Sequence, residues 1–180
     1  MEIKNAIWSP AFAIALIAFT FDLLQPAFGQ EPRPAPAPAL ISLGEAQAII
    51  EGAIAFTRER NLVMAIVVMD QSGYEVASAR MDGAAFRNMT FAEGKAYASA
   101  LYGQTTEELG ALAATRPDRY FGIMEMYPGK FYLVGGGVPL SVDGTLVGAV
   151  GIAGLPQGVD EMAARAGMAV WEEYRANNGG

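Results

Sequence analysis

The stretch Phe131–Gly154, FYLVGGGVPLSVDGTLVGAVGIAG, decides the fold, because two apolar runs in it flank the pair Asp143-Gly144. Asp-Gly between β-rich runs predicts a β-hairpin, since both central residues of a type I′ turn need a positive φ. The second run is interrupted by three glycines: Gly148, Gly151 and Gly154. Glycines in a strand indicate either a pocket wall or a twisted sheet packed closely against a helix, and these residues alone leave both interpretations open.

The composition excludes several classes of function. With 180 residues, of which 52% are hydrophobic, the chain is sized for a single domain with one core. The formal net charge of −7 argues against nucleic acid as a partner, because phosphate binding relies on clustered Lys and Arg. The sequence contains no Cys and no His. This excludes disulfides, thiol catalysis, the usual zinc sites, His-based triads and His or Cys ligands to haem.

The N-terminal segment predicts export. Residues 1–29 contain an apolar stretch from Ile7 to Leu24, and the small residues Ala27 and Gly29 then occupy the positions that a signal peptidase requires. We expect a cleaved signal peptide and a periplasmic location, with an uncleaved membrane anchor as the alternative. Residues 30–39 are rich in alternating prolines and predict an extended, disordered tether.

Between residues 40 and 176 we expect one domain. Capping-box spacings begin helices at Ser42, Thr90 and Thr105, and apolar periodicity predicts a last helix over Val159–Tyr174. Strands are expected over 62–69 and 74–80, and residues 115–129 are expected to form a long apolar loop with a short helical turn. The fold class that follows is α/β of the α+β kind, a mainly antiparallel five-stranded sheet with helices packed on it.

Three segments carry a resemblance to a known family. GGGVPL at residues 135–140 is followed by VDG, by VGAVGIAG and by Asp160-Glu161, and upstream lie DQSGYEVASARMDG at 70–83 and EGKAYASA at 93–100. The chain resembles the GlcG/HbpS family of haem-binding or haem-degrading-type domains, which are also seen as the C-terminal domain of some cobalamin adenosyltransferases. The resemblance spans residues 40 to 174, and it implies a profilin-like layered domain, homo-oligomers that are often octamers, and haem as ligand.

The segment Arg80-Met81-Asp82 resembles a part of the family that helps to line the ligand pocket. Arg80 is suited to hold a carboxylate, such as a haem propionate, with two hydrogen bonds. The alternative is an Arg80–Asp82 pair that only fixes a turn.

Lys95 and Tyr97 lie two positions apart on a predicted helix, so we expect only one of them to face a shared cavity. For Lys95 the alternative is a solvated helix face, although its neighbours are small and apolar. The glycine run is expected to border the same pocket. The complete set of candidate ligand-binding residues is Arg80, Met81, Asp82, Lys95, Tyr97, Gly135, Gly136 and Gly137.

Without His or Cys, a haem iron has only Tyr, Met, Lys or a small hydroxyl as donors. Tyr74 occupies a position where members of the family commonly have histidine, which makes it the candidate iron ligand. The function that follows is an exported haem-binding-type protein that holds haem or another small planar or anionic molecule. The alternative is a small-molecule enzyme with acid-base chemistry on the same scaffold, for which the sequence assigns no catalytic residue.

Overall fold

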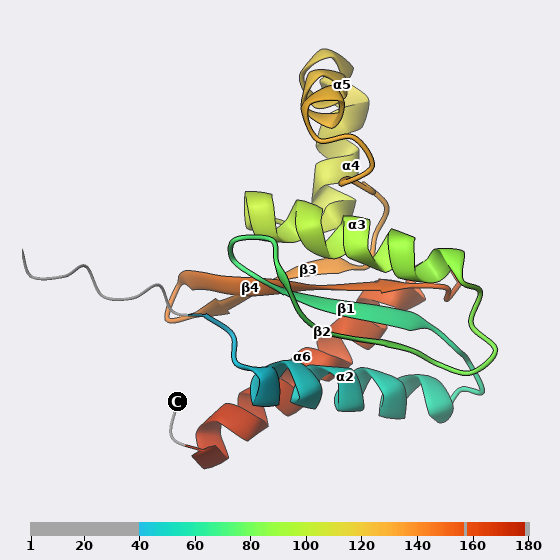
Figure 1. Cartoon of the computed structure of the whole chain (residues 1–180), viewed down its shortest axis with the longest axis vertical. Coiled ribbons are helices and arrows are strands. Elements are labelled where there is room, and N and C mark those ends of the chain that lie inside the picture. Colours follow the sequence, from blue (N-terminus) through green and yellow to red (C-terminus); the bar gives the residue numbers. More distant parts are fainter. Residues whose placement is uncertain (1–39, 157, 179–180) are drawn as a thin grey trace, which may run out of the picture. The chain divides into compact units, whose positions relative to one another are not determined.

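The computed structural model describes residues 40–156 and 158–178, in which two β-hairpins alternate with helices (Figure 1). The predicted signal peptide and tether lie outside these residues. In chain order the elements are α2 (Leu43–Arg58), β1 (Ala65–Asp70), β2 (Glu75–Arg80), α3 (Arg87–Tyr102), α4 (Thr106–Thr115), α5 (Pro117–Met126), β3 (Gly137–Val142), β4 (Thr145–Ala153) and α6 (Val159–Asn178). Within the described ranges, no helix is both long enough and apolar enough to span a bilayer.

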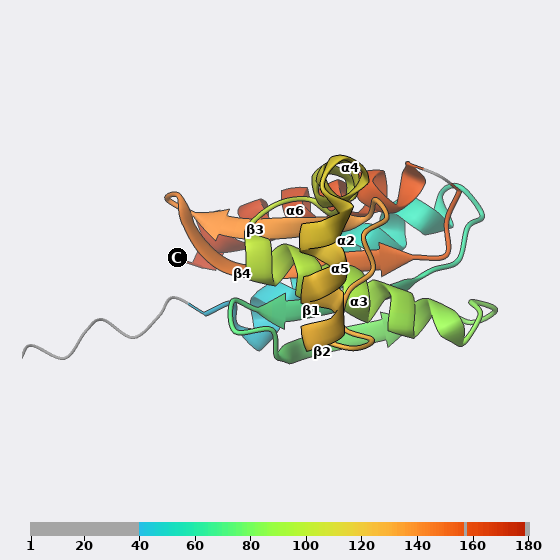
Figure 2. The same cartoon turned by 90° about the horizontal axis from the view of Figure 1, so that it is seen from above.

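The strands form one antiparallel sheet in the order β2-β1-β4-β3. Helix α3 covers one face over β1 and β4, and α2 and α6 cover the other (Figure 1, Figure 2). The expected α+β class is confirmed, but the expectation of five strands is wrong, because the described residues contain four. Residues 131–136 do not pair as a strand. The Tyr132 amide instead donates to the Gly94 carbonyl of α3, which binds this run to the helix.

The hairpin at Asp143-Gly144 is confirmed, since φ is 49° at Asp143 and 76° at Gly144. Gly151 of β4 faces α3, and a Cβ built there would lie 2.1 Å from the Ala92 carbonyl oxygen. At this position the glycine serves close packing of helix on sheet, the second of the two interpretations that the sequence left open.

The two faces of the sheet pack differently. On β1, Ile66 and Val68 point into the larger cluster with α2 and α6, while Ala65 and Val67 point toward α3. The partners that α3 contributes to this second cluster include Ala92 and Ala96. Because small residues line both sides of this contact, α3 approaches the sheet closely, and this brings its side chains to the end of β4.

Local sequence patterns correctly predicted several of the helix starts. The capping boxes at Ser42 and Thr105 are both present. The predicted start at Thr90 is wrong, because α3 already begins at Arg87 without a side-chain cap. The predicted loop over 115–129 is also wrong, since α5 forms there with Pro117 in its first turn, where the missing N–H costs no hydrogen bond.

Glu45, in the first turn of α2, links this helix to α6, the last helix of the domain. Its carboxylate accepts hydrogen bonds from the Ser42 amide at 2.8 Å, from the Trp171 indole at 3.2 Å and from Arg175. Burial raises the pKa of Glu45, but the hydrogen bonds from Ser42, Arg175 and Trp171 outweigh burial and hold the pKa below its ordinary value of 4.5. The negative charge of Glu45 is therefore part of what stabilises the fold.

We expect Glu45→Gln to lower the free energy of unfolding at pH 7 by about 1.5–3 kcal/mol, the range for hydrogen bonds to charged groups. Because the folded-state pKa is depressed, this stabilisation is present above the unfolded-state pKa and is lost as the pH falls through the folded-state value. Urea unfolding at pH 7 and at several values below 4.5 measures both effects, with exposed Glu51→Gln on the same helix as control. An equal loss of stability below pH 4.5 in the variant and the parent would contradict the assignment.

Candidate ligand-binding cavity

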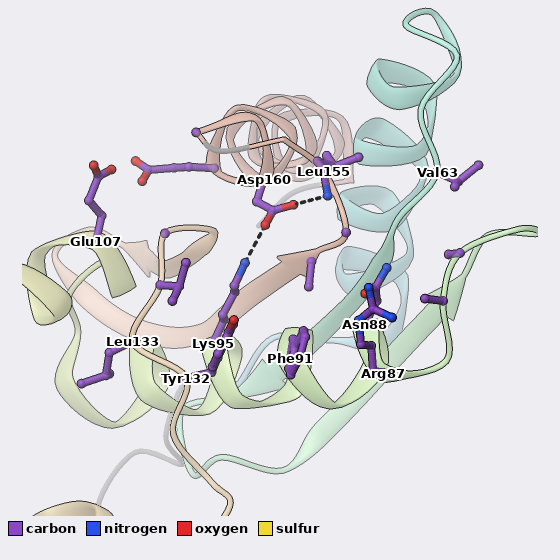
Figure 3. A pocket seen from close by; sticks show the side chains of 18 of the residues that line it. Val63, Arg87, Asn88, Phe91, Lys95, Glu107, Tyr132, Leu133, Leu155 and Asp160 are labelled. Carbon is purple, nitrogen blue, oxygen red and sulfur yellow. Dashed lines mark hydrogen bonds and ion pairs between the residues drawn. The ribbon is translucent and has the colours of Figure 1, made fainter. Parts of the chain in front are cut away.

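A cavity of about 1010 Å³ opens between α3, the end of β4 and the start of α6. Figure 3 shows side chains from these elements around one space, with Asn88, Phe91 and Lys95 on α3 and Asp160 opposite them. The segment that follows α5 contributes Tyr132, and the first turn of α4 contributes Glu107. The wall therefore combines segments that are far apart in the sequence.

Lys95 and Asp160 form a buried ion pair in the wall of this cavity. The Lys95 ammonium donates to Asp160 Oδ2 at 2.6 Å and to the Ile152 carbonyl at 2.8 Å, and Asp160 Oδ1 accepts from the Leu155 amide at 3.0 Å (Figure 3). Lys95 is 2% exposed. The pair therefore ties α3 to the end of β4 and the start of α6.

Burial acts on both members of the pair. It lowers the pKa of Lys95 against the opposing hydrogen bond and charge of Asp160. It raises the pKa of Asp160 against the opposing contributions of Lys95 and the Leu155 amide. A desolvated pair of titratable groups in a cavity wall is typical of functional sites, although structural ion pairs show the same pattern.

Glycine makes the pair sterically possible. Gly136 has φ of 120°, and a Cβ there would lie 2.6 Å from the Asp160 Cβ and 2.9 Å from the Lys95 ammonium nitrogen. The Gly136 carbonyl also accepts from the Ile152 amide at 2.9 Å. A side chain at this position would thus displace the pair as well as strain the backbone.

One face of α3 lines the cavity. Asn88, Phe91 and Lys95 follow the i, i+3, i+7 spacing that puts side chains on the same side of a helix. The Phe91 ring stacks on Tyr132 with 4.6 Å between ring centroids and 13° between planes. Arg87 lies exposed beside Asn88. This face therefore offers an aromatic surface with polar groups at both ends.

Of the candidate residues from the sequence, Lys95 and Gly135 line the cavity, and Gly136 contacts the ion pair. Arg80 does not line it. Its guanidinium donates to the Ala84 carbonyl at 2.6 Å, which anchors the loop before α3 at the rim. The described ion pairs do not include the alternative Arg80–Asp82 contact.

Met81 packs against the larger core cluster, and its sulfur accepts a hydrogen bond from the Thr57 hydroxyl at 3.4 Å. Asp82 is exposed in the loop that Arg80 anchors. Gly137 is buried, and its amide donates to the Thr106 hydroxyl at 2.8 Å. The cavity lining includes none of these three residues.

Tyr97 and Tyr74 also lie away from the cavity. Tyr97 packs edge-on against Phe131, with 5.7 Å between centroids, and contacts the β1–β2 turn. Tyr74 is 72% exposed and follows that turn. Along β1 the turn lies roughly 16 Å from Ala65, which pairs with Ala153 beside the cavity. Tyr74 is therefore not positioned to ligate iron bound in this cavity.

Several cavity residues escaped the sequence analysis: Asn88, Phe91, Tyr132, Glu107, Asp160 and Glu161. Asn88 precedes the start that was predicted for α3, so the common face it shares with Lys95 was not visible. Asp160 and Glu161 contributed to the sequence analysis only as part of the family resemblance, and neither was a candidate ligand-binding residue. A helix that began at residue 87 would have revealed the spacing of Asn88, Phe91 and Lys95. Among the described ranges, no group of three or more Asp, Glu, His or Cys side chains is placed to hold a metal ion.

The fold and the site define a class: a helix-covered antiparallel sheet with a cavity at one end of its central strands. Residues 41–169 match the family model of haem-degrading HbpS-like proteins, so the chain belongs to the HbpS-like family. This agrees with the resemblance seen in the sequence.

Three relatives illustrate the likeness. An uncharacterized 15.0 kDa protein of Citrobacter freundii from the dhaT-dhaS intergenic region is 26% identical over 136 residues, covering 75% of this chain and 94% of that protein. A double mutant of HbpS from Streptomyces reticuli is 27% identical with a TM-score of 0.70, covering 78% of this chain and 92% of that one. PduOC, solved in complex with haem, is 24% identical with a TM-score of 0.66, and the match covers 73% of this chain and 94% of PduOC. This match shows the likeness of fold.

Proposed function

We propose that this protein binds haem or a similar planar organic anion in the cavity beside α3. The observation that carries the proposal is the stacked pair Phe91–Tyr132, flanked on the same helix face by Asn88 and by the buried Lys95. The family model, which describes haem-degrading proteins, supports it, as does the haem complex of PduOC on the same fold.

The cavity fits the organic part of such a ligand. Its volume, about 1010 Å³, is at the upper end of the range for small-molecule sites. Aromatic rings such as Phe91 and Tyr132 prefer offset or edge contacts with another ring, and a porphyrin offers a large ring face. Arg87, exposed at the rim, is suited to bind a propionate with two parallel hydrogen bonds.

Few residues of the cavity are able to ligate a haem iron. His and Cys are absent from the whole sequence, and among the described lining residues Tyr132 carries the one phenol, a group able to ligate ferric haem. We therefore propose that Tyr132, in place of Tyr74, would hold the iron if haem were bound. Haem iron would supply redox chemistry, while the residues of the chain bind the ring and hold its carboxylates.

The test is a titration of the purified chain with haemin and with iron-free protoporphyrin IX, followed by the Soret band. We expect saturable binding of each at one site per chain. Phe91→Ala should weaken both, whereas Tyr132→Phe should weaken haemin and shift its spectrum with little effect on protoporphyrin. Tyr74→Phe, at a tyrosine that is 72% exposed and lies away from the cavity, serves as control. Unchanged spectra with both compounds would exclude this function.

A second candidate is an enzyme that exchanges protons with a small carbonyl or carboxylate substrate. The observation that favours it is the buried pair Lys95–Asp160, whose two members could serve as general acid and base if the substrate reached them. Saturable porphyrin binding that the double variant Lys95→Met, Asp160→Leu leaves intact would favour the first candidate over this one, since the double variant leaves no buried charge unpaired.

We also propose that the chain is exported and forms homo-oligomers. The apolar leader before the proline-rich segment supports export. Exposed apolar side chains of α5, among them Phe121 and Met126, support self-association. The mass of the protein isolated from its source cell tests for a mature start near Gln30, and sedimentation of that protein tests for a multiple of the chain mass.

A further inference from the structure

The two ends of the cavity differ in charge. Figure 3 shows Arg87 and Asn88 at one end and Glu107 at the other, with Phe91, Lys95 and Asp160 between them. The charges of Lys95 and Asp160 offset each other within their pair. The cavity is therefore electrically polar along its length.

Asn88 marks the first end as a place for a ligand. Its side chain lines the cavity, the residue is 7% exposed, and its amide has no side-chain hydrogen bond to any residue in 40–156 or 158–178. A Cβ at Gly154 would lie 2.3 Å from the Asn88 amide nitrogen, so glycine leaves the space that the amide occupies. The fully buried atoms that lack a partner among the described residues do not include those of this amide, so the amide is open to the cavity, where a ligand can bind it. Beside it, Arg87 makes this end suitable for a carboxylate.

Glu161 and Glu107 mark the second end. Glu161 Oε1 accepts from Arg165 at 2.6 and 3.0 Å, but Oε2 is buried without a partner among the described residues. A Cβ built at Gly135 would lie 3.7 Å from the Glu107 Cβ, and one at the next residue, Gly136, would lie 2.6 Å from the Cβ of Asp160, so the first turn of α4 and the start of α6 border the same glycine run. Glu107 lies in that same turn and lines the cavity. This end therefore presents carboxylate oxygens that need hydrogen-bond donors.

We propose that the cavity selects planar ligands with two unlike ends, a carboxylate that binds Arg87 and Asn88 and an N–H or O–H donor that binds Glu107 and Glu161. The inference rests on the proposed function, because it uses the same cavity. Asn88 and Lys95 are two helical turns apart, about 10 Å, and Glu107 lies beyond Lys95 (Figure 3), so a molecule of at least two fused rings is needed to span the site. In the reversed orientation the carboxylate would meet Glu107 and Glu161, and like charges repel.

Three matched probes test the selection: 6-hydroxy-2-naphthoate has both end groups, 2-naphthoate has only the carboxylate, and 2-naphthol has only the donor. Fluorescence titration of the full chain should show 6-hydroxy-2-naphthoate binding about 10-fold tighter than either single-ended probe, the effect of one hydrogen bond to a charged group. Equal affinities for all three, or no saturable binding of any, would overturn the inference.

Variants should separate the two ends. Asn88→Leu and Arg87→Gln should weaken the two carboxylate probes about 10-fold and leave 2-naphthol unchanged. Glu107→Gln and Glu161→Gln should weaken the two hydroxyl probes and leave 2-naphthoate equal or tighter. Arg58→Gln and Glu51→Gln, both exposed on α2, are the matched controls. If the variants at either end of the cavity changed the affinities for all three probes equally, the proposed difference in charge between the two ends would be wrong.

The porphyrin titration distinguishes the two proposals. If haemin binds saturably while the naphthalene probes do not discriminate, the proposed function stands and the end-to-end selection is wrong. If haemin fails to bind while the probes show the expected order, the selection stands and haem is the wrong ligand.

Discussion

Asp160→Ala is expected to lower the free energy of unfolding by about 3–5 kcal/mol, because it leaves a buried ammonium without its carboxylate. Lys95 is 2% exposed, and its other described partners are uncharged: the Ile152 carbonyl and, 5.8 Å from the ammonium nitrogen to the ring centroid, Tyr132. The Leu155 amide would also lose its acceptor, Asp160 Oδ1. The expected loss is comparable to a large part of the stability of a typical domain.

The pH dependence of this loss identifies its cause. Burial already lowers the pKa of Lys95, and removing Asp160 removes the two contributions that oppose burial. Between the lowered pKa of Lys95 and its ordinary value of 10.5, the folded state of the variant therefore binds fewer protons than the unfolded state. The free energy of unfolding of the variant consequently rises with pH in this window. The deficit relative to the parent should narrow as the pH is raised toward 10.5.

Urea unfolding at several pH values measures the deficit, with Asp118→Ala, an exposed acid in the first turn of α5, as control. Lys95→Met combined with Asp160→Leu should recover much of the stability, since apolar groups can replace a buried ion pair at little cost. A loss below about 1 kcal/mol, the range of exposed pairs, would mean that water reaches both charges.

The parts of the fold that the sequence predicted are those that depend on neighbouring residues. Ser42 and Glu45 cap α2 within four residues, and Asp143-Gly144 forces a hairpin through its own backbone angles. α5 was missed because Pro117 and Gly122 argue against a helix, whereas contact outside the helix helps to order it. Tyr120 is buried, 6.2 Å from the ring of Tyr102.

The site was less predictable than the fold. Lys95 and Asp160 are separated by 65 positions, and no local pattern joins them. The family resemblance pointed to Arg80 and Tyr74, but Arg80 anchors a loop to Ala84 and Tyr74 lies at the other end of the sheet. Both are polar residues beside turns, and at such positions the sequence looks the same whether the residue stabilises the turn or binds a ligand.

Gly151→Val should separate α3 from the sheet, with a loss of about 3 kcal/mol or more in the free energy of unfolding. Overpacking typically costs about 1–3 kcal/mol, and here the obstacle cannot rotate away. A Cβ at Gly151 would lie 2.1 Å from the Ala92 carbonyl oxygen and 2.5 Å from the Ala96 amide nitrogen, both in the backbone of α3. The added atoms must therefore displace the helix or the strand.

The displacement should also reach the cavity, because Lys95 precedes Ala96 on the helix and its ammonium contacts Ile152, the next residue of β4. Gly151→Ala should give a smaller loss of the same sign, and both variants should weaken 6-hydroxy-2-naphthoate in proportion to the loss of stability. Gly122→Ala is the matched control, since a Cβ there meets nothing within 4 Å and alanine favours a helix by about 0.5–1 kcal/mol. Urea unfolding and probe titration on the three variants decide the outcome. A Gly151→Val protein that unfolds and binds like the parent would show that α3 lies further from β4 than the 2.1 Å approach implies.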